Sequence, residues 1–463
     1  MNRRNVFPAL AFVLPLTVYL LTMPPGLTWA HYGADGGDLI TAAVTLGVPH
    51  PSGYPTYTLL GWLFSKLPFG TPAWRFNLLS ALATAGAAFW VYRIIADRTS
   101  NRRAGMIGAW AFALSPLVWG QAIIAEVYGV NLFFVGLLLW LLNRRNFFWL
   151  GVVFGLALGT HLTAIFWLPV VVYVVISHSS FGTRNFMLGF LLGAASFLYL
   201  PFRAGQGAVT WGEPNTLGGF WALVSGQIYR GYLFSLPPDA LANRIIVLAR
   251  YFINPGIVPL MLAGLGIWRG WQQNRALTLT ILVSAGGYTI AALGYATADS
   301  FVYLLPVFLL MGIAVGQGMV QLLADISPQW RQLTFAGVMV ILLITAAVNW
   351  KSVDLRRDIA AETFWQEILT DAPARAVLLT DTDRATFALW YARFVLGKRP
   401  DVVVVDTRLA AFDWHRADLQ RHYSDLPQLA EIDTLFKQHR QYPRPLCRVY
   451  NSSETHWSLN CNR

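Results

Sequence analysis

Long apolar segments recur along most of this chain, and this feature restricts the possible fold more than any other. A helix crosses the hydrocarbon core of a bilayer with about 20 apolar residues, and with fewer where it is short or broken. Only 12% of the residues are charged, against about 25% in a typical soluble domain. The sequence therefore predicts a polytopic α-helical membrane protein. Eleven transmembrane helices are predicted, near residues 6–23, 76–96, 104–120, 125–142, 147–160, 162–177, 185–202, 245–268, 276–296, 301–323 and 332–350.

The basic residues gather in short loops, and this pattern predicts how the helices are oriented. Arginines cluster in the first five residues and in the loops that begin at Asp97 and Asn143, which favours the cytoplasmic side for these loops and for the N-terminus. The first apolar segment lacks a signal-peptide cleavage site, so we interpret it as a span. The loops at residues 24–75 and 203–244, and everything after Trp350, then lie on the outer side. This topology explains the net charge of +11, and no nucleic-acid partner is expected.

From residue 351 onward charged residues become frequent and no apolar run is long enough to span a membrane. We therefore divide the chain into a membrane domain, residues 1–350, and a soluble extracytoplasmic α/β domain, residues 351–463. In the second domain "ARAVLLTDTD", a helical stretch and "DVVVVDTR" follow one another, which is typical of a βαβ unit. Asp381 and Asp383 come where the first strand ends, a usual place for ligand contacts in open α/β sheets.

Only two cysteines occur, Cys447 and Cys461, both near the C-terminus. Two cysteines are too few for a zinc cluster. A single disulfide between them is expected if this end of the chain lies in an oxidising compartment.

Two aspartates stand directly after the first predicted span, in "GADGGDLITAAVTLGV". Asp35 and Asp38 are three residues apart, so both carboxylates can project from one face of a helix. The apolar residues after Asp38 predict a helix that lies along the membrane surface. Aspartate is also favoured at a helix N-terminus, so plain helix capping competes with catalysis as the role of this pair.

The next stretch, "PHPSGYPTY", combines a histidine and a tyrosine with three prolines. Proline fixes its own backbone and restricts the residue before it. His50 and Tyr54 are therefore predicted to be held in nearly fixed geometry. A lone histidine is more often structural than catalytic, but its neighbours here favour ligand binding.

Further unusual polar residues fall in other loops on the predicted outer side. An ionisable group at membrane depth is costly and by default suggests a function. Arginines at an outer surface suit a phosphate or a carboxylate. Groups from five loops on one side predict a polar cavity there, whereas a transporter is expected to carry polar groups at mid-membrane. The remaining candidate binding residues are Glu126, Tyr128, His161, Arg203, Arg230, Asp299 and Tyr303.

Several of these stretches resemble, in order, the motifs of one family. Asp35, Gly36, Gly37 and Asp38 match its acidic motif, with Gly36 in place of serine and Asp38 in place of glutamate. "LGVPHPSGYPTY", "WGQAIIAEVYGVN", "LGTHLT", "YLPFRA", "DSFVYLLP" and "LWYARFVLGKRPDVVVVD" follow in the family's order. The family comprises multi-spanning proteins formerly described as having unknown function and now placed in the glycosyltransferase C superfamily. Its animal relatives are protein O-mannosyltransferases.

This resemblance implies an inverting transfer of a sugar, mannose as the first candidate, from a polyprenyl-phosphate-linked donor to an acceptor hydroxyl on a protein or a glycan. By the same resemblance Asp35 is the catalytic base, with Asp38 as its partner. The chemistry of the long outer loop then predicts that Arg203, alone or with Arg230, holds the lipid phosphate and stabilises the charge on the leaving group. No cofactor is expected, and a divalent metal is left out. Two other functions stay open, a glycolipid transporter or flippase and a non-catalytic membrane scaffold. The absence of long disordered tails favours a prokaryotic inner membrane as the location.

Overall fold

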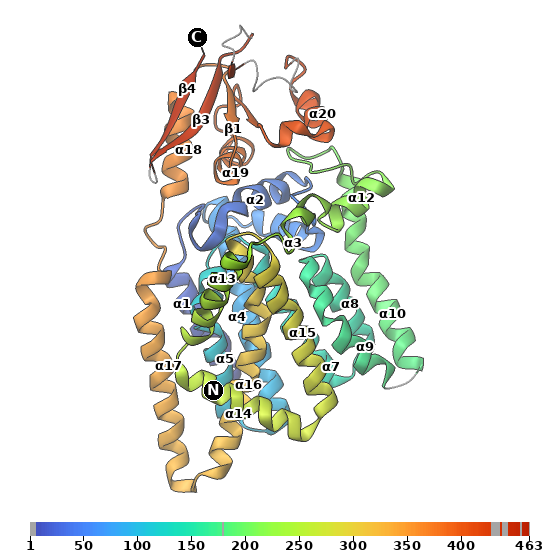
Figure 1. The fold of residues 1–463 in the computed structure, drawn as a ribbon, viewed down its shortest axis with the longest axis vertical. Coiled ribbons are helices and arrows are strands. Elements are labelled where there is room, and N and C mark those ends of the chain that lie inside the picture. The colour runs from blue at the N-terminus through green and yellow to red at the C-terminus, as the bar shows by residue number, and fades with distance from the viewer. Residues whose placement is uncertain (1–5, 178–179, 427–435, 438–442, 454–455, 463) are drawn as a thin grey trace.

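The fold consists of a bundle of helices with a small sheet domain at one end (Figure 1). It was obtained as a computed structural model, and it describes residues 6–177, 180–426, 436–437, 443–453 and 456–462. The helices of the bundle are α1 Val6–Thr22, α2 Gly36–Thr45, α3 Pro55–Ser65, α4 Pro72–Thr99, α5 Arg102–Ala113, α6 Pro116–Ala122, α7 Val127–Arg144, α8 Phe147–Leu158, α9 Leu168–Ile176, α10 Ser180–Ala194, α11 Tyr199–Arg203, α12 Leu217–Val224, α13 Pro238–Ile253, α14 Ile257–Gln273, α15 Arg275–Gly294, α16 Leu305–Asp325 and α17 Arg331–Val353.

Short helices of tighter winding connect or extend these elements. Most of them carry outer-loop residues or begin an apolar helix. In the bundle they are η2 Ala30–Asp35, η3 Leu162–Trp167, η4 Ala195–Leu198, η5 Gln227–Tyr232, η6 Asp299–Leu304 and η7 Pro328–Trp330.

The predicted multi-pass architecture is confirmed. Fewer than the eleven predicted helices, however, are long and apolar enough to cross a membrane among the described residues. Six described helical segments are long and apolar enough to cross a membrane, and a bent pair makes a seventh if it is counted as one span. Three shorter apolar helices, Val6–Thr22, Phe147–Leu158 and Leu162–Ile176, fall below that length. The span predicted over residues 245–268 is not one continuous helix. The chain bends by 92° between α13 and α14, where Pro255 lacks an amide proton and Gly256 has a φ of 102°.

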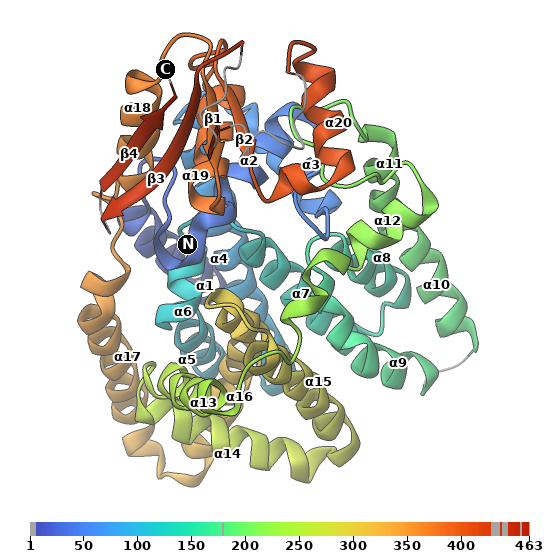
Figure 2. The same cartoon turned by 45° about the horizontal axis from the view of Figure 1, so that its top comes forward.

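The two ends of the bundle differ in what they carry. The turns from α14 to α15 and from α16 to α17 lie at the end away from the sheet, whereas α2, α3 and α12 lie at the end that carries it, with α12 below α20 Asp413–His422 (Figures 1 and 2). The loops predicted to be outer therefore meet at the sheet end. This arrangement places their polar residues next to the soluble domain.

Glycines allow the closest helix contacts in the bundle. A Cβ atom on Gly189 of α10 would lie 1.9 Å from the carbonyl oxygen of Phe148, and one on Gly193 would lie 2.1 Å from that of Val152. Inside a membrane, helices associate through such small-residue contacts because lipid tails are as apolar as the side chains. The pair α8 and α10 therefore packs backbone against backbone.

The soluble domain is built on a four-stranded sheet of order β2-β1-β3-β4. Strand β1 pairs in parallel with β2, with Val377 opposite Val403, and also with β3, whereas β3 and β4 are antiparallel. The predicted βαβ unit is thus confirmed as β1, α19, η8 and β2. The elements are α18 Ala360–Asp371, β1 Val377–Thr380, α19 Asp383–Trp390, η8 Tyr391–Val395, β2 Val403–Asp406, η9 Leu409–Ala411, α20 Asp413–His422, β3 Leu446–Ser453 and β4 His456–Cys461.

Aromatic packing joins this domain to the first outer loop. The ring of Trp29, just before η2, lies 5.2 Å from that of Phe364 in α18 and 6.0 Å from that of Trp457 in β4. Aromatic pairs at such distances contribute beyond the area they bury. The soluble domain therefore packs directly on the loop that carries Asp35.

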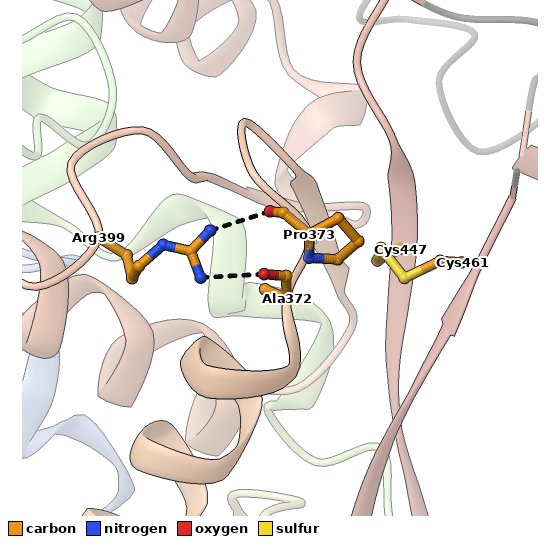
Figure 3. Close-up of a disulfide and its surroundings, with 5 residues drawn as sticks. All are labelled: Ala372, Pro373, Arg399, Cys447 and Cys461. Carbon is orange, nitrogen blue, oxygen red and sulfur yellow. Dashed lines mark hydrogen bonds between the residues drawn. A yellow bond between two sulfur atoms is a disulfide. The ribbon is translucent and has the colours of Figure 1, made fainter.

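A disulfide closes the outer edge of the sheet. Cys447 and Cys461 are directly opposite each other on β3 and β4 and are bonded. On the far side of β1, the Arg399 guanidinium donates to the carbonyl oxygens of Ala372 and Pro373, just after the last turn of α18 (Figure 3). A cation is favoured at a helix C-terminus because the last carbonyls lack partners.

We expect the double substitution Cys447→Ser with Cys461→Ser to loosen β3 and β4. A disulfide that closes a loop of about 15 residues contributes about 3 kcal/mol, which corresponds to about 100-fold faster amide hydrogen exchange where local opening dominates. Exchange measured by mass spectrometry on the full chain tests this. Wild-type protein treated with a reductant serves as the control and should match the variant. Exchange in β3 and β4 within threefold of the oxidised protein would contradict the prediction.

Candidate active site

A cavity of about 570 Å³ lies where the outer loops of the bundle meet the soluble domain. Its wall includes parts of η2, the turn after α2, η3, η5, η6 and α19. Polar groups that converge in one cavity are the usual form of an active site. The predicted residues that line it are Asp35, His50, Tyr54, Tyr128, His161, Arg230, Asp299 and Tyr303.

Asp38 does not line this cavity. Its side chain is fully buried in the first turn of α2, where Oδ2 accepts hydrogen bonds from the backbone amide of His50 at 2.9 Å and from His50 Nδ1 at 2.7 Å. Oδ1 accepts a third from Trp211 Nε1 at 3.1 Å. A carboxylate engaged in this way cannot reach a substrate, so the expected direct catalytic role of Asp38 is replaced by a role in positioning His50.

Asp35 presents its carboxylate to the cavity. It stands at the N-cap position of α2 but makes no side-chain capping hydrogen bond, so capping does not account for it. The side chain is 35% exposed, and Oδ2 lies 3.5 Å from His50 Nε2. Burial raises the pKa of Asp35 to about 7. The charge of His50 opposes this rise, whereas the carboxylates of Asp383 and Asp299 add to it.

His50 is held between the two aspartates. Its Nδ1–H donates to Asp38, and the Tyr54 hydroxyl lies 3.1 Å from Nε2 while donating to the carbonyl oxygen of Pro51. The tyrosine oxygen is then left to accept a hydrogen bond from Nε2–H, so both ring nitrogens donate. Burial alone would lower the pKa of His50, but Asp35 and Asp38 outweigh it and raise the pKa to about 9. We therefore describe His50 as an imidazolium near neutral pH.

The glycines of the aspartate loop permit a close approach of the soluble domain. A Cβ atom on Gly37 would lie 2.3 Å from the carbonyl oxygen of Phe387 in α19. The Phe387 ring stacks on His50 with centroids 6.3 Å apart and an angle of 11°. The sequence therefore brings α19 onto α2 only because no side chain stands at residue 37.

Aromatic rings form the membrane-facing wall of the cavity. His161 stacks on Tyr54 at 6.0 Å and also contacts the rings of Tyr128 and Tyr303 at 5.2 Å and 5.7 Å. Its Nδ1 accepts from the amide of Thr163, which leaves the proton on Nε2. Burial lowers the pKa of His161 to about 4, so this ring is neutral. Such a wall suits the apolar face of a ligand.

Two predicted binding residues are used elsewhere. Arg203 donates from Nε to the carbonyl oxygen of Leu46 and from a terminal nitrogen to Gln206, both at 2.7 Å, and so supports the turn after α2 outside the cavity. Glu126 caps α7, where its side chain accepts from the amide of Val127 at 3.3 Å.

The soluble domain contributes residues that the sequence analysis did not assign to the site. Asp383, Arg384 and Phe387, all on α19, line the cavity. Asp383 pairs with Arg408 at 2.7 Å, whereas in the described part of the chain no hydrogen bond or ion pair engages the Arg384 guanidinium. The position of Asp383 after the first strand was a usable signal. No sequence signal indicated Arg384, because its place in the cavity depends on how α19 packs against the helix bundle.

Arg230 is the second guanidinium of the cavity wall. It lies on η5 and donates to the Ser225 hydroxyl at 3.2 Å, which leaves most of its donors free for a ligand. Two guanidiniums and a carboxylate of raised pKa thus share one cavity. Among the described residues no group of three or more His, Cys, Asp or Glu side chains is arranged to hold a metal ion.

The same architecture occurs in solved structures. ArnT from Cupriavidus metallidurans, in a crystal structure bound to undecaprenyl phosphate, aligns with a TM-score of 0.59 over 99% of this chain and 97% of that chain, at 12% identity. The apo structure of the same protein aligns with a TM-score of 0.60 at 11% identity. Together with the cavity, this likeness defines the chain as a multi-pass membrane protein with a glycosyltransferase C-like fold.

Sequence comparison then places the chain within that class. Residues 35–184 match the family described as "Protein O-mannosyl-transferase TMEM260 N-terminal domain", and residues 361–448 match "TMEM260-associated domain 2". The chain is therefore related to the TMEM260 protein O-mannosyl-transferase family.

Two relatives are named as members of that family. The Protein O-mannosyl-transferase TMEM260 of Mus musculus is 26% identical over 89% of this chain and 64% of its own length. The protein of the same description from Dictyostelium discoideum is 34% identical over 28% of this chain and 16% of its own length. The chain thus spans less than two thirds of the length of either relative.

Proposed function

We propose that this protein is a membrane glycosyltransferase. It transfers a hexose, with mannose as the first candidate, from a polyprenyl-phosphate-linked donor to an acceptor hydroxyl of a protein or a glycan. The observation that carries the proposal is the Asp35 carboxylate, held in the cavity 3.5 Å from His50. The names of the relatives support the reaction class, and the lipid in the ArnT structure supports the donor class.

The proposed reaction is a single displacement with inversion. The acceptor hydroxyl gives its proton to Asp35 and its oxygen attacks the anomeric carbon, while the bond from that carbon to the phosphate oxygen breaks. The lipid phosphate leaves with the bonding electron pair, and Arg230 and Arg384 stabilise the charge that develops on it. The His50 imidazolium orients Asp35 and is in turn positioned by Asp38 and Tyr54.

An activity assay with defined components tests the proposal. The purified protein is given a polyprenyl-phosphate mannose and a serine- and threonine-rich acceptor peptide. Release of lipid phosphate together with mannosylation of the peptide is the expected result. A flippase would move the lipid across sealed vesicles without releasing phosphate, and a scaffold would do neither.

We also propose the orientation expected from the sequence, with the N-terminus cytoplasmic and the soluble domain on the other side. The separation of the basic loops from the cavity supports it, and the disulfide fits an oxidising compartment. Both relatives come from eukaryotes and give no support to a prokaryotic membrane. Accessibility of cysteines introduced on either side of intact membranes tests the orientation.

Arg384→Gln should raise the KM for the lipid donor by about 10- to 100-fold, because a charge-assisted hydrogen bond to phosphate is worth about 1.5–3 kcal/mol. The product analogue undecaprenyl phosphate should also inhibit the variant more weakly. Arg375→Gln is the matched control, since Arg375 is an exposed arginine of the same domain that pairs with Asp425 outside the cavity. An unchanged donor KM in Arg384→Gln would remove Arg384 from the phosphate site.

A further inference from the structure

A second cavity, of about 590 Å³, lies among the membrane helices toward the end away from the soluble domain. It is bounded by α4, α7, α9, α14, α15 and α16. Its walls are mainly aliphatic, and its rim carries polar groups near the ends of these helices. The proposed transferase reaction makes no use of this cavity.

Buried aromatic residues separate it from the candidate active site. Both cavities lie along α15 and along the segments η3–α9 and η6–α16, but Trp167 and Tyr288 stand between their linings and are fully buried. The two rings are 6.1 Å apart, and the ring of Phe166 packs on Tyr288 at 5.1 Å. The second cavity is therefore a compartment of its own and not a continuation of the donor site.

The charge at the rim has one sign. Arg98 and Arg145 line the cavity, and its described lining contains no aspartate or glutamate. Nearby Arg93 and Arg144 both pair with Asp97, at 3.2 Å and 2.8 Å. In contrast, no described hydrogen bond or ion pair engages the guanidinium of Arg98 or of Arg145. Two arginines without described partners, in a lining that carries no other charge, favour an anionic ligand.

The aliphatic interior of this cavity favours a ligand with a hydrocarbon chain. An empty apolar cavity destabilises a protein in proportion to its volume, and water does not fill an apolar cavity. Open space also reaches the backbone of α14, since a Cβ atom built on Gly264 has no neighbour within 4 Å. A ligand with an anionic head and a hydrocarbon chain satisfies both the rim and the walls. Basic pockets between membrane helices bind anionic lipid headgroups in this way.

We propose that this cavity binds one anionic phospholipid, drawn from the leaflet opposite the soluble domain. Arg98 and Arg145 bind its headgroup phosphate, and an acyl chain fills the space beside Gly264. Site occupancy does not depend on the transferase reaction.

Native mass spectrometry of the purified full chain tests this proposal, with phosphatidylglycerol and phosphatidylcholine of identical acyl chains as probes. The wild type should retain one phosphatidylglycerol under conditions that strip phosphatidylcholine. The double variant Arg98→Gln with Arg145→Gln should bind phosphatidylglycerol about 30-fold more weakly, the scale expected for two removed charges. Arg269→Gln is the matched control, because Arg269 lies near the end of α14 and does not line the cavity.

A second variant addresses the chain of the lipid. Gly264→Leu projects into open space and favours the helix, so the protein should fold while binding of both lipids falls at least tenfold. Phosphatidylglycerol binding within twofold of wild type in both variants would overturn the proposal. One-for-one displacement of the phospholipid by undecaprenyl phosphate would also overturn it, since the cavity would then hold the donor lipid.

Discussion

Asp35→Asn should lower kcat/KM for sugar transfer about 10³-fold while leaving the KM for the lipid donor within a few-fold of wild type. The amide keeps the size of the carboxylate but cannot accept the acceptor's proton, and general-base catalysis typically supplies 10²–10⁴-fold. Steady-state kinetics with the lipid donor and an acceptor peptide provide the measurement. Glutamate at the same position keeps a base and should retain more activity than asparagine.

The pH dependence gives a second test of the same assignment. Asp35 acts as a base only when ionised, so kcat/KM should rise with pH through about 7, its raised pKa. His50 orients it as an imidazolium, so kcat/KM should fall again as pH passes about 9. The two limbs belong to the coupled pair and give an optimum near pH 8. Full activity in Asp35→Asn, or a wild-type profile that is flat from pH 6 to pH 9, would exclude Asp35 as the base.

Much of this architecture could be predicted because hydrophobic length and loop charge are local properties of a sequence. The alternation of two β-branched runs with a helical stretch correctly predicted a parallel βαβ unit. The bend between α13 and α14 does not follow from apolar character, because the apolar run continues on both sides of Pro255 and Gly256. Positions of helices were therefore easier to predict than their breaks.

Within the site, the sequence identified residue types but not their partners. Asp35 and Asp38 look equivalent in "GADGGD", yet one faces the cavity and the other is buried against His50 and Trp211. Trp211 comes from a loop more than 150 residues further along the chain, so no local pattern shows this hydrogen bond. Arg384 is a similar case, because its place depends on the contact between α19 and Gly37. Such roles are set by tertiary packing.

Asp38→Asn should reduce kcat/KM about 10²-fold although residue 38 never touches the substrate. The neutral amide no longer favours a proton on both ring nitrogens of His50, and a displaced His50 ceases to orient Asp35. A misplacement of about 1 Å in a catalytic constellation can cost this much. If the role of Asp38 were only structural, the substitution would lower the amount of folded protein and leave the pH profile of the remaining activity unchanged.

The pH profile therefore distinguishes the two explanations. Without the Asp38 carboxylate the pKa of His50 falls from about 9 toward its ordinary value of about 6.5, so the alkaline limb moves to lower pH. The positive charge of His50 also lowers the pKa of Asp35. When that charge is lost, the pKa of Asp35 rises further and the acid limb moves to higher pH. The two limbs converge and little active form remains at any pH. Trp211→Phe is the matched control, because it removes the hydrogen bond to Oδ1 while keeping an aromatic ring beside His50, and it should leave both limbs in place. Wild-type limbs in Asp38→Asn would contradict a positioning role, since His50 would then hold its proton without this carboxylate.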